Sequence, residues 1–559
     1  MEQRKQSGRL GSFSLPENFK LNTNNFFILC LWRGNPWAVR GIGFPRTALT
    51  FFSRMNPFAC LCKLLLLFAF ATPLGAADYH VSNRGHDDAD GLTATNAWRS
   101  LERVNRTVFQ PGDRLLFESG GQWTGFLRPQ GSGVQDQPIR LGRYGDGSLP
   151  RLTATGVVVR FENQDFWEVS EIEIVGGNTK PDAVTGGIHF VATNAGRILR
   201  HIVVRDCVIH DLGGSFKEYE SCAIWVGVEG WNKEHGLTTT FEWVRIENNR
   251  IRNTGRCGIL VWTCAAPAGQ TDGNRMFREG LLPSKHVTIR KNVIEDLGGD
   301  AILVLGSEKP LIEYNTVRRS CLRTGDPAVP VHPGYNPHSA AVWLHSCLEG
   351  IMQFNEVTDS GKQSGNNDGM AFDFDFNCKG CILQYNVSRD NAGGFLLIMQ
   401  SARDNIARYN LSLNDRDHLL YLVGKLEENN LVHNNTFHVR DGAGYIIPRA
   451  RIVNNIFLIS GSATMEERDG GGEFRNNAYH GDWKKLPADP SPVVADPLLL
   501  KPQPASDLAT TFRNYSLRPG SPCRGRGAAI PNNGSRDLNG TPVPSNAPLD
   551  LGALQSTGP

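Results

Sequence analysis

The chain has 559 residues with a formal net charge of +2, and 60 of its residues are glycine, about 11%. A content of 40% hydrophobic and 9% aromatic residues excludes a disordered chain, and glycine without a Gly-X-Y period excludes collagen. The near-zero charge without a Lys/Arg-rich run offers no basic surface for phosphates, so no nucleic-acid partner is expected.

The N-terminal segments are expected to lie outside the mature fold. Residues 55–77 combine a charged start, an apolar run of roughly ten residues and small residues at Gly75 and Ala77, which is typical of a secretory signal peptide. The run is too short for a membrane span, which needs about 20 apolar residues. Because a signal peptide normally begins a chain, residues 1–54 are interpreted as a non-native upstream extension before the true start at Met55. A secreted or periplasmic protein without a membrane span in the mature chain is therefore predicted.

The cysteines carry little functional signal. Removal of the predicted leader would leave nine of the 12 cysteines in a compartment where disulfides can form. Cys378 and Cys381 form a lone CxxC pair, and the four-cysteine spacing of a structural zinc site is absent. We interpret this pair as a local disulfide or as two buried thiols rather than as a redox centre.

A short phrase recurs through the middle of the chain. It consists of an alternating β-type run, an Asn or once an Asp, and one or two further apolar positions. The Asn or Asp positions lie 20 to 43 residues apart: Asp206, Asn249, Asn292, Asn315, Asn355, Asn386, Asn410, Asn435, Asn455 and Asn477. Asn tolerates the left-handed backbone of a bend, and its amide can bond the Asn of the next repeat. The repeat therefore predicts an asparagine ladder inside a solenoid.

A second strand follows each Asn after a turn with Gly or Asp. Examples are CGILVW (257–262), DAILVL (300–305) and MAFDFD (370–375). Two or three short strands in each repeat, with no helical period, predict an all-β chain folded as a single-stranded parallel β-helix. The predicted organisation is an N-terminal β segment and cap over 78–160, β-helix repeats with loop insertions over 161–480, and closing rungs with a C-terminal tail over 481–559.

The middle of the chain resembles the right-handed parallel β-helix proteins of the pectate-lyase-like superfamily. The stretch YHVSNRGHDDADGLTATNAWRSLERVN (79–105) resembles the opening segment common in these proteins, and VVADPLLL (493–500) with YSLRPGSPCRGRG (515–527) resembles their closing rungs. The resemblance covers nearly all of residues 79–554. It implies a right-handed solenoid and a secreted carbohydrate-active protein, because many members are polysaccharide lyases or glycoside hydrolases.

Alignment of the second strands predicts two columns of outward side chains, because neighbours along a strand point to opposite faces. The columns are Leu260, Leu303, Trp343, Asp373 and Leu396, and Trp262, Leu305, His345, Asp375 and Ile398. Phe395 and Leu397 are placed inside with the other alternate residues. An outer face so apolar must be covered or must bind a ligand. Insertions predicted around Glu229–Thr240, Thr263–Ser284, Cys321–His338 and Asp359–Asp368 would wall a cleft beside these columns.

Asp373 and Asp375 are the predicted catalytic residues. Carboxylates at i and i+2 of one strand lie about 7 Å apart, and crowding raises one pKa so that an acid and an ionised group coexist. Glycoside hydrolysis requires that combination. His345, one rung earlier in the Asp375 column, is expected to orient that carboxylate or share its proton. A solvated strand face for the two aspartates, and a packed structural histidine, are the alternatives.

The predicted substrate-binding residues are Trp262, Trp343, Asp300, Tyr335 and His338. The two tryptophans would serve as platforms on which sugar rings stack, unless the insertions cap them as a satellite core. Asp300 is either a turn residue or a third carboxylate. Tyr335 and His338, in the loop VHPGYNPHS, are placed over the cleft.

Three functions remain open at this point. The favoured one is a glycoside hydrolase on an extracellular polysaccharide, which needs no cofactor. The second is a polysaccharide lyase, for which the resemblance implies a Lys or Arg base and Ca²⁺, with Asp373 and Asp375 as ligands; the best base candidates, Arg323 and Lys362, lie only in loops. The third is a non-catalytic glycan-binding or surface solenoid. The oligomeric state is not predicted.

Overall fold

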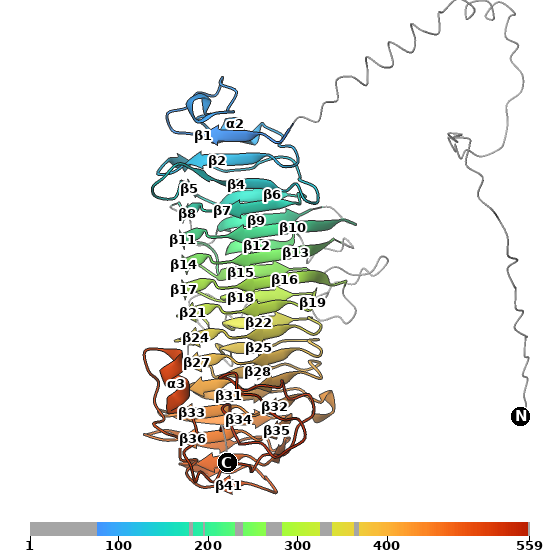
Figure 1. Ribbon diagram of the computed structural model, residues 1–559, viewed down its shortest axis with the longest axis vertical. Coiled ribbons are helices and arrows are strands. Elements are labelled where there is room, and N and C mark those ends of the chain that lie inside the picture. The colour runs from blue at the N-terminus through green and yellow to red at the C-terminus, as the bar shows by residue number, and fades with distance from the viewer. Residues whose placement is uncertain are drawn as a thin grey trace, which may run out of the picture. The chain divides into compact units, whose positions relative to one another are not determined.

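The chain folds into a stack of β-coils that runs from residue 75 to the C-terminal region (Figure 1). The computed structural model describes residues 75–177, 183–193, 196–229, 239–263, 282–324, 338–362 and 368–556. The predicted upstream extension and nearly all of the predicted signal peptide lie outside these ranges. Among the described helices, none has the length and apolar character that crossing a bilayer requires.

Three sheets run along the stack, and every pairing between their named strands is parallel. Sheet 1 contains β1 (Asp78–Val81), β2 (Arg114–Glu118), β4 (Ile139–Tyr144), β7 (Trp167–Ser170), β10 (Ile198–Arg205), β13 (Thr240–Glu247), β16 (Ser284–Arg290), β19 (Ser307–Glu308), β20 (Leu311–Glu313), β23 (Ile351–Gln353), β26 (Ile382–Gln384), β29 (Ile406–Arg408), β32 (Leu431–His433), β35 (Arg451–Val453) and β38 (Glu473–Arg475). Sheet 2 contains β3 (Gln122–Thr124), β5 (Arg151–Ala154), β8 (Glu173–Gly176), β11 (Val208–Leu212), β14 (Arg250–Thr254), β17 (Val293–Leu297), β21 (Thr316–Arg318), β24 (Glu356–Thr358), β27 (Val387–Arg389), β30 (Leu411–Leu413), β33 (Thr436–Val439), β36 (Ile456–Ile459), β39 (Ala478–His480) and β41 (Val493–Val494). Sheet 3 contains β6 (Val157–Glu162), β9 (Gly186–Ala192), β12 (Cys222–Val228), β15 (Cys257–Trp262), β18 (Ile302–Leu305), β22 (Val342–His345), β25 (Phe372–Phe374), β28 (Leu396–Ile398), β31 (Asp417–Leu422), β34 (Ala443–Pro448), β37 (Thr464–Glu467) and β40 (Trp483–Lys485).

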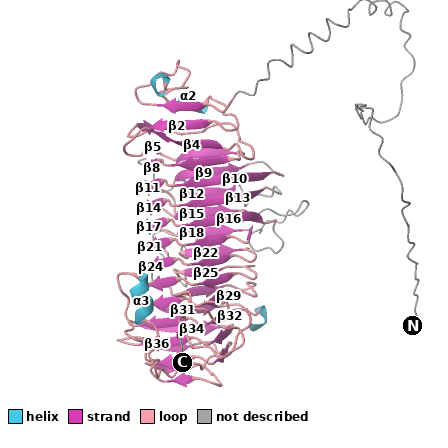
Figure 2. Ribbon diagram, in the orientation of Figure 1, coloured by secondary structure: helices cyan, strands magenta, loops and turns pink. Residues whose placement is uncertain are grey.

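Helices are few and short in the described chain (Figure 2). They are η1 (Ala94–Asn96), α2 (Leu101–Asn105), η3 (Leu426–Glu428) and α3 (Leu508–Asn514). Strand alternation and the scarcity of helical periodicity therefore predicted the fold class correctly, and three sheets correspond to three strands in a full coil.

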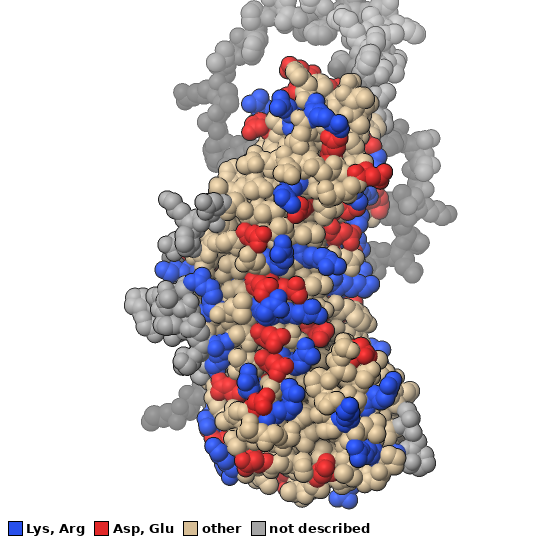
Figure 3. All heavy atoms as spheres, turned by 90° about the vertical axis from the view of Figure 1, so that its left-hand side faces the viewer, with Lys and Arg blue, Asp and Glu red and all other residues tan. Residues whose placement is uncertain are grey.

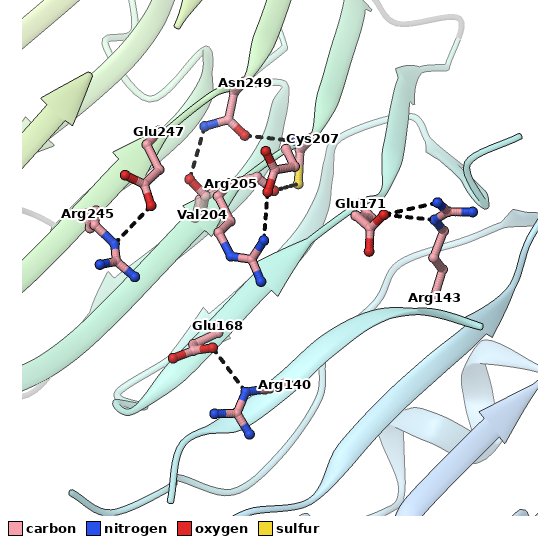
Figure 4. Close-up of polar contacts among 11 residues, drawn as sticks. Arg140, Arg143, Glu168, Glu171, Val204, Arg205, Cys207, Arg245, Glu247 and Asn249 are labelled. Carbon is pink, nitrogen blue, oxygen red and sulfur yellow. Dashed lines mark hydrogen bonds and ion pairs between the residues drawn. The ribbon is translucent and has the colours of Figure 1, made fainter. Parts of the chain in front are cut away.

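An asparagine ladder runs through the solenoid, as the repeat predicted. From Asn249 to Asn455, each side-chain Nδ2 donates to Oδ1 of the next ladder asparagine at 2.9–3.0 Å, and Asn477 ends the series on Asp489. Figure 4 shows its first step, where Asn249 donates to the Val204 carbonyl and accepts from the Cys207 N–H. Cys207, not Asp206, occupies the ladder position in that coil, which corrects the predicted register there.

The left-handed backbone of these bends is not at the ladder asparagine. It falls on the residue before it: Asn248, Lys291, Tyr314, Phe354, Tyr385, Tyr409, Asn434, Asn454 and Asn476, with φ between 50° and 60°. The asparagine is therefore selected for its amide hydrogen bonds, and the strained residue beside it varies in type. Burial of each amide with its partners stabilises the stack because an unpaired buried amide is costly.

Charged side chains cover much of the outer surface in alternating rows along the side where sheet 2 lies (Figure 3). Cross-coil pairs such as Arg151 with Glu173 at 2.8 Å and Arg319 with Asp296 at 2.6 Å join successive strands. Similar pairs on sheet 1 include Arg140 with Glu168 (Figure 4). Exposed pairs of this kind contribute ~0–1 kcal/mol each, so the interior supplies the main stabilisation.

The last coils are covered by the C-terminal segment, which turns back along the solenoid (Figure 1). The hydroxyl of Tyr385 donates to the carbonyl of Arg536 at 3.2 Å, and Asn434 donates to the carbonyl of Asp550 at 3.0 Å. Cys378 and Cys381 are buried and free in the structure, in line with the interpretation as two thiols.

Candidate functional site

A cavity of about 410 Å³ opens on the outer side of sheet 3, over β22, β25, β28 and β31. Its lining combines carboxylates, histidines and aromatic rings: Tyr219, His338, Ser339, Ala340, Trp343, His345, Asp368, Asp373, Asp375, Phe376, Leu397, Met399, Gln400, Tyr421 and Val423. A concave site with convergent polar groups on apolar walls is the usual form of a small-ligand site. The cavity lies where the outward columns of the sequence predicted a cleft.

The strand register explains how these residues meet. Trp343 lies beside Leu303 on one side and Asp373 on the other, while Val342 and Phe372 pair in the interior. The predicted columns are thus confirmed through Asp373. The next coil was assigned wrongly: Leu397, not Leu396, pairs with Asp373 and lines the cavity. Leu396 and Ile398 belong to the interior core.

Asp373 lies on β25 beneath the cavity with only 4% of its surface exposed. Its Oδ1 atom is buried and has no hydrogen-bond partner among the residues described. Burial, reinforced by the charges of Asp375, Asp368 and Asp300, holds the pKa of Asp373 well above its usual range. Burial therefore favours the neutral form of this side chain.

Asp375 follows β25 and is more open, with 15% of its side chain exposed. Its Oδ1 accepts a 2.8 Å hydrogen bond from the N–H of Phe376. Burial raises the pKa of Asp375 to about 7, with Asp368 adding to the rise. A carboxyl group that titrates near neutral pH is suited to donate a proton to a leaving group.

His345 is fully buried beneath Asp375. Its Nε2 lies 3.9 Å from Oδ2 of Asp375, and its Nδ1 contacts the Ser346 hydroxyl at 2.9 Å. Burial lowers the pKa of His345 to about 3, so the imidazole is neutral in the physiological range. It therefore contributes a neutral wall beside Asp375.

Asp368 is a third carboxylate of the cavity that the sequence analysis treated only as a loop boundary. Its Oδ2 accepts a 2.8 Å hydrogen bond from Nδ1 of His338, and 20% of its side chain is exposed. His338 thus lies at the cavity, where the sequence placed it. The spacing of Asp368, Asp373 and Asp375 within eight residues could have indicated the third carboxylate. Asp368 was instead assigned to the end of a predicted insertion.

The structure separates the predicted aromatic platforms. Trp343 lines the cavity although it is only 5% exposed and belongs to the same satellite core as Trp262, which is 1% exposed and does not line the cavity. Trp262 therefore cannot stack on a sugar, which corrects that prediction. Trp262 belongs instead to a satellite core with apolar side chains of neighbouring coils, and the insertions expected to cap it lie largely outside the described residues.

Asp300 is also displaced from its predicted role. It is fully buried and lies behind the wall, where its Oδ1 accepts a 3.0 Å hydrogen bond from Nε1 of Trp343. Tyr335 lies outside the described residues, as does most of the four predicted insertions. Aromatic lining that the sequence did not reveal comes from Tyr219 and Tyr421; the latter continues the Asp373 and Leu397 column.

The described residues do not fit a metal centre. Within the described ranges no group of three or more His, Cys, Asp and Glu side chains is arranged to hold an ion. Ca²⁺ takes six to eight oxygen ligands, more than Asp373 and Asp375 would supply.

The family described as a right-handed β-helix region matches residues 236–437. The chain is a right-handed parallel β-helix. This β-helix chain is similar to a lacto-N-biosidase of Bifidobacterium longum subsp. longum, with 26% identity over 516 residues. The match covers 76% of the chain but 32% of the relative, so the chain spans about a third of the length of that relative.

Solved structures with the same fold include the GH136 lacto-N-biosidase from Eubacterium ramulus. Its native form aligns with a TM-score of 0.53 and 24% identity, covering 71% of this β-helix chain and 68% of that one. The selenomethionine form gives a TM-score of 0.52 and 23% identity, covering 71% and 67%. These likenesses concern the fold.

Proposed function

We propose that the protein is an extracellular glycoside hydrolase whose reaction takes place in the cavity on sheet 3. The observation that carries the proposal is a set of three aspartates at one aromatic-walled cavity, with differing exposure. Glycoside hydrolysis needs one protonated and one ionised carboxyl group beside the scissile bond. The similarity to proteins named lacto-N-biosidases supports the same reaction class.

Asp375 is assigned as the general acid. Its pKa of about 7 keeps a proton available at neutral pH, and its partial exposure lets a glycosidic oxygen approach. The N–H of Phe376 fixes Oδ1 at 2.8 Å, and Oδ2 lies 3.9 Å from Nε2 of His345, so the carboxyl group is held from two sides. The neutral His345 beside it withdraws no proton.

Asp368 is assigned as the ionised partner, acting as base or nucleophile. An ionised carboxylate needs water or hydrogen-bond donors around it, and Asp368 has both solvent exposure and the N–H of His338. Asp373 is 4% exposed and burial raises its pKa, so it fits the ionised role less well. The Asp373 and Asp375 pair predicted from the sequence remains the alternative assignment.

Trp343, Tyr219 and Tyr421 supply the walls on which the apolar faces of sugar rings would pack. The volume of about 410 Å³ suits a short stretch of glycan. We place the reaction outside the cell because residues 55–77 have the pattern of an export signal. N-terminal sequencing of the exported protein tests that placement, with a start at residue 78 expected.

The lyase alternative has weaker support from the site. Lys362 forms an ion pair with Asp417, and neither Lys362 nor Arg323 lines the described cavity. A lyase base must reach the carbon beside a uronate carboxylate. Binding without cleavage is the remaining alternative, which the aromatic walls alone would permit.

One panel assay separates the three functions. The protein is incubated with neutral glycans, uronate polymers and p-nitrophenyl lacto-N-bioside, and products are analysed for new reducing ends and unsaturated sugars. New reducing ends without unsaturated product are expected. Unsaturated uronate products would instead indicate a lyase, and binding without products would indicate a binding protein.

A further inference from the structure

A buried ion pair lies directly behind two walls of the cavity. Nε of Arg256 is 3.5 Å from Oδ2 of Asp300, and the exposed fractions of the two side chains are 3% and 0%. Arg256 precedes β15 and Asp300 precedes β18, so the pair joins neighbouring coils of sheet 3 (Figure 1). Neither residue lines the cavity.

Each member of the pair holds a different aromatic wall. Asp300 Oδ1 accepts the 3.0 Å hydrogen bond from the indole Nε1 of Trp343, which lies on the next coil. The guanidinium carbon of Arg256 lies 3.6 Å from the ring centroid of Tyr219, within cation–π range. Arg256 also donates to the carbonyl of Phe216, which anchors the loop that carries Tyr219.

A buried ion pair is an energetically unfavourable choice for the wall of a solenoid. Two buried charges lose hydration, and apolar residues of similar volume often stabilise a fold as well or better. The contacts of this pair are directional, however, and they converge on two side chains of one cavity. Satellite-core neighbours such as Leu260 and Leu303 would fill space without fixing either ring.

We propose that Arg256 and Asp300 are positioning residues that fix the rings of Trp343 and Tyr219 and so set the affinity of the cavity for a glycan. The ligand class in this inference rests on the proposed function, whereas the positioning of the two rings does not depend on it. The hydrogen bond selects one orientation of the indole, since a ring flip would leave a buried carboxylate oxygen without its donor. The guanidinium of Arg256 packs on the ring of Tyr219, which also contacts Trp262 with a centroid distance of 4.8 Å.

The test compares three conservative variants. Asp300→Asn retains shape but removes the charge, Arg256→Lys retains a cation without the planar fork, and Trp343→Phe keeps an aromatic ring but removes its N–H. The full-length protein is labelled with ¹⁵N-tryptophan, and the indole resonance lost in Trp343→Phe identifies Trp343. Affinity for p-nitrophenyl lacto-N-bioside is measured by calorimetry in the Asp375→Asn background, which prevents turnover.

Asp300→Asn and Trp343→Phe are each expected to weaken glycan binding about tenfold, and the double variant no more than either alone. Asp300→Asn should shift the Trp343 resonance, and Arg256→Lys should produce a smaller shift. Asp415→Asn is the matched control because Asp415 is an equally buried carboxylate that does not line the cavity. It should change neither readout.

An unchanged Trp343 resonance in folded Asp300→Asn would overturn the proposal, as would additive losses of affinity in the double variant. A shifted resonance with unchanged affinity would also overturn it. If the otherwise unmodified Asp375→Asn protein binds no glycan, the proposed function fails, and the resonance alone decides whether the ion pair positions Trp343. The two failures are therefore distinguishable.

Discussion

Nε2 of His345 faces Oδ2 of Asp375 at 3.9 Å from the adjacent coil, and both groups are largely removed from water. Burial moves their pKa values in opposite directions, lowering that of His345 to about 3 and raising that of Asp375 to about 7. The contact therefore joins a neutral imidazole to a carboxyl group that titrates near neutrality. If Asp375 is the proposed general acid, its protonation should govern activity near neutral pH.

The first prediction concerns the alkaline limb of the pH profile. If Asp375 donates the proton, kcat/KM should fall about tenfold per pH unit above roughly pH 7, because the reactive form is the protonated one. Asp375→Asn should lower activity by roughly 10² to 10⁴-fold on unactivated glycans. An aryl glycoside with a good leaving group should lose less, because it needs less protonation. Equal losses on both substrates would argue against the role as acid.

The second prediction concerns the asparagine ladder. Asn386 donates to Asn410, Met352 and Gln384 and accepts from Asn355, all inside the solenoid. Asn386→Ala leaves several of these groups unpaired and should lower the free energy of unfolding by ~2–4 kcal/mol. Urea denaturation followed by circular dichroism measures the change. The exposed Asn539→Ala serves as control, and an equal effect of the two substitutions would contradict the role of the ladder.

The sequence revealed the ladder because its hydrogen bonds need the same residue in every coil. Side chains of the cavity follow no such repeat, so only the columns of alternating strands indicated them. The column assignment failed at GGFLLIM (393–399), where every residue is apolar or glycine and alternation carries no information. Trp343 and Trp262 look alike in the sequence and both are buried in the structure, yet only Trp343 reaches the cavity. Asp368 was not predicted as a site residue because the alternating strand pattern does not extend into its loop.

The third prediction concerns stability against pH. Asp415 is fully buried among Ser388, Ser412 and Asn391, and burial raises its pKa to about 6. Since the folded state binds this proton more tightly than the unfolded state, stability from this group is present below about pH 4 and is lost as the pH rises to 6. The loss amounts to ~3 kcal/mol for two pKa units.

Asp415→Asn should remove that dependence, because the amide does not titrate. The difference between the melting temperatures at pH 4.5 and pH 7 should become smaller in the variant than in the native protein. Scanning calorimetry at the two pH values measures it. An identical pH dependence in both proteins would show that Asp415 does not titrate in this range.

The fourth prediction concerns metal removal. Because the described residues offer no cluster that fits a metal, activity on neutral glycans should be unchanged after dialysis against EDTA. Activity is measured before dialysis, after it and after addition of excess Ca²⁺. A loss that Ca²⁺ restores would favour the calcium-dependent lyase over the hydrolase.

The most direct measurement is the rate of reducing-end release by the native protein and by the Asp368→Asn, Asp373→Asn and Asp375→Asn variants, each shown by circular dichroism to be folded. The hydrolase mechanism predicts release by the native protein without unsaturated sugars, near-complete loss in Asp368→Asn and Asp375→Asn, and a smaller loss in Asp373→Asn. Full activity in Asp375→Asn, or an unsaturated product from the native protein, would contradict it.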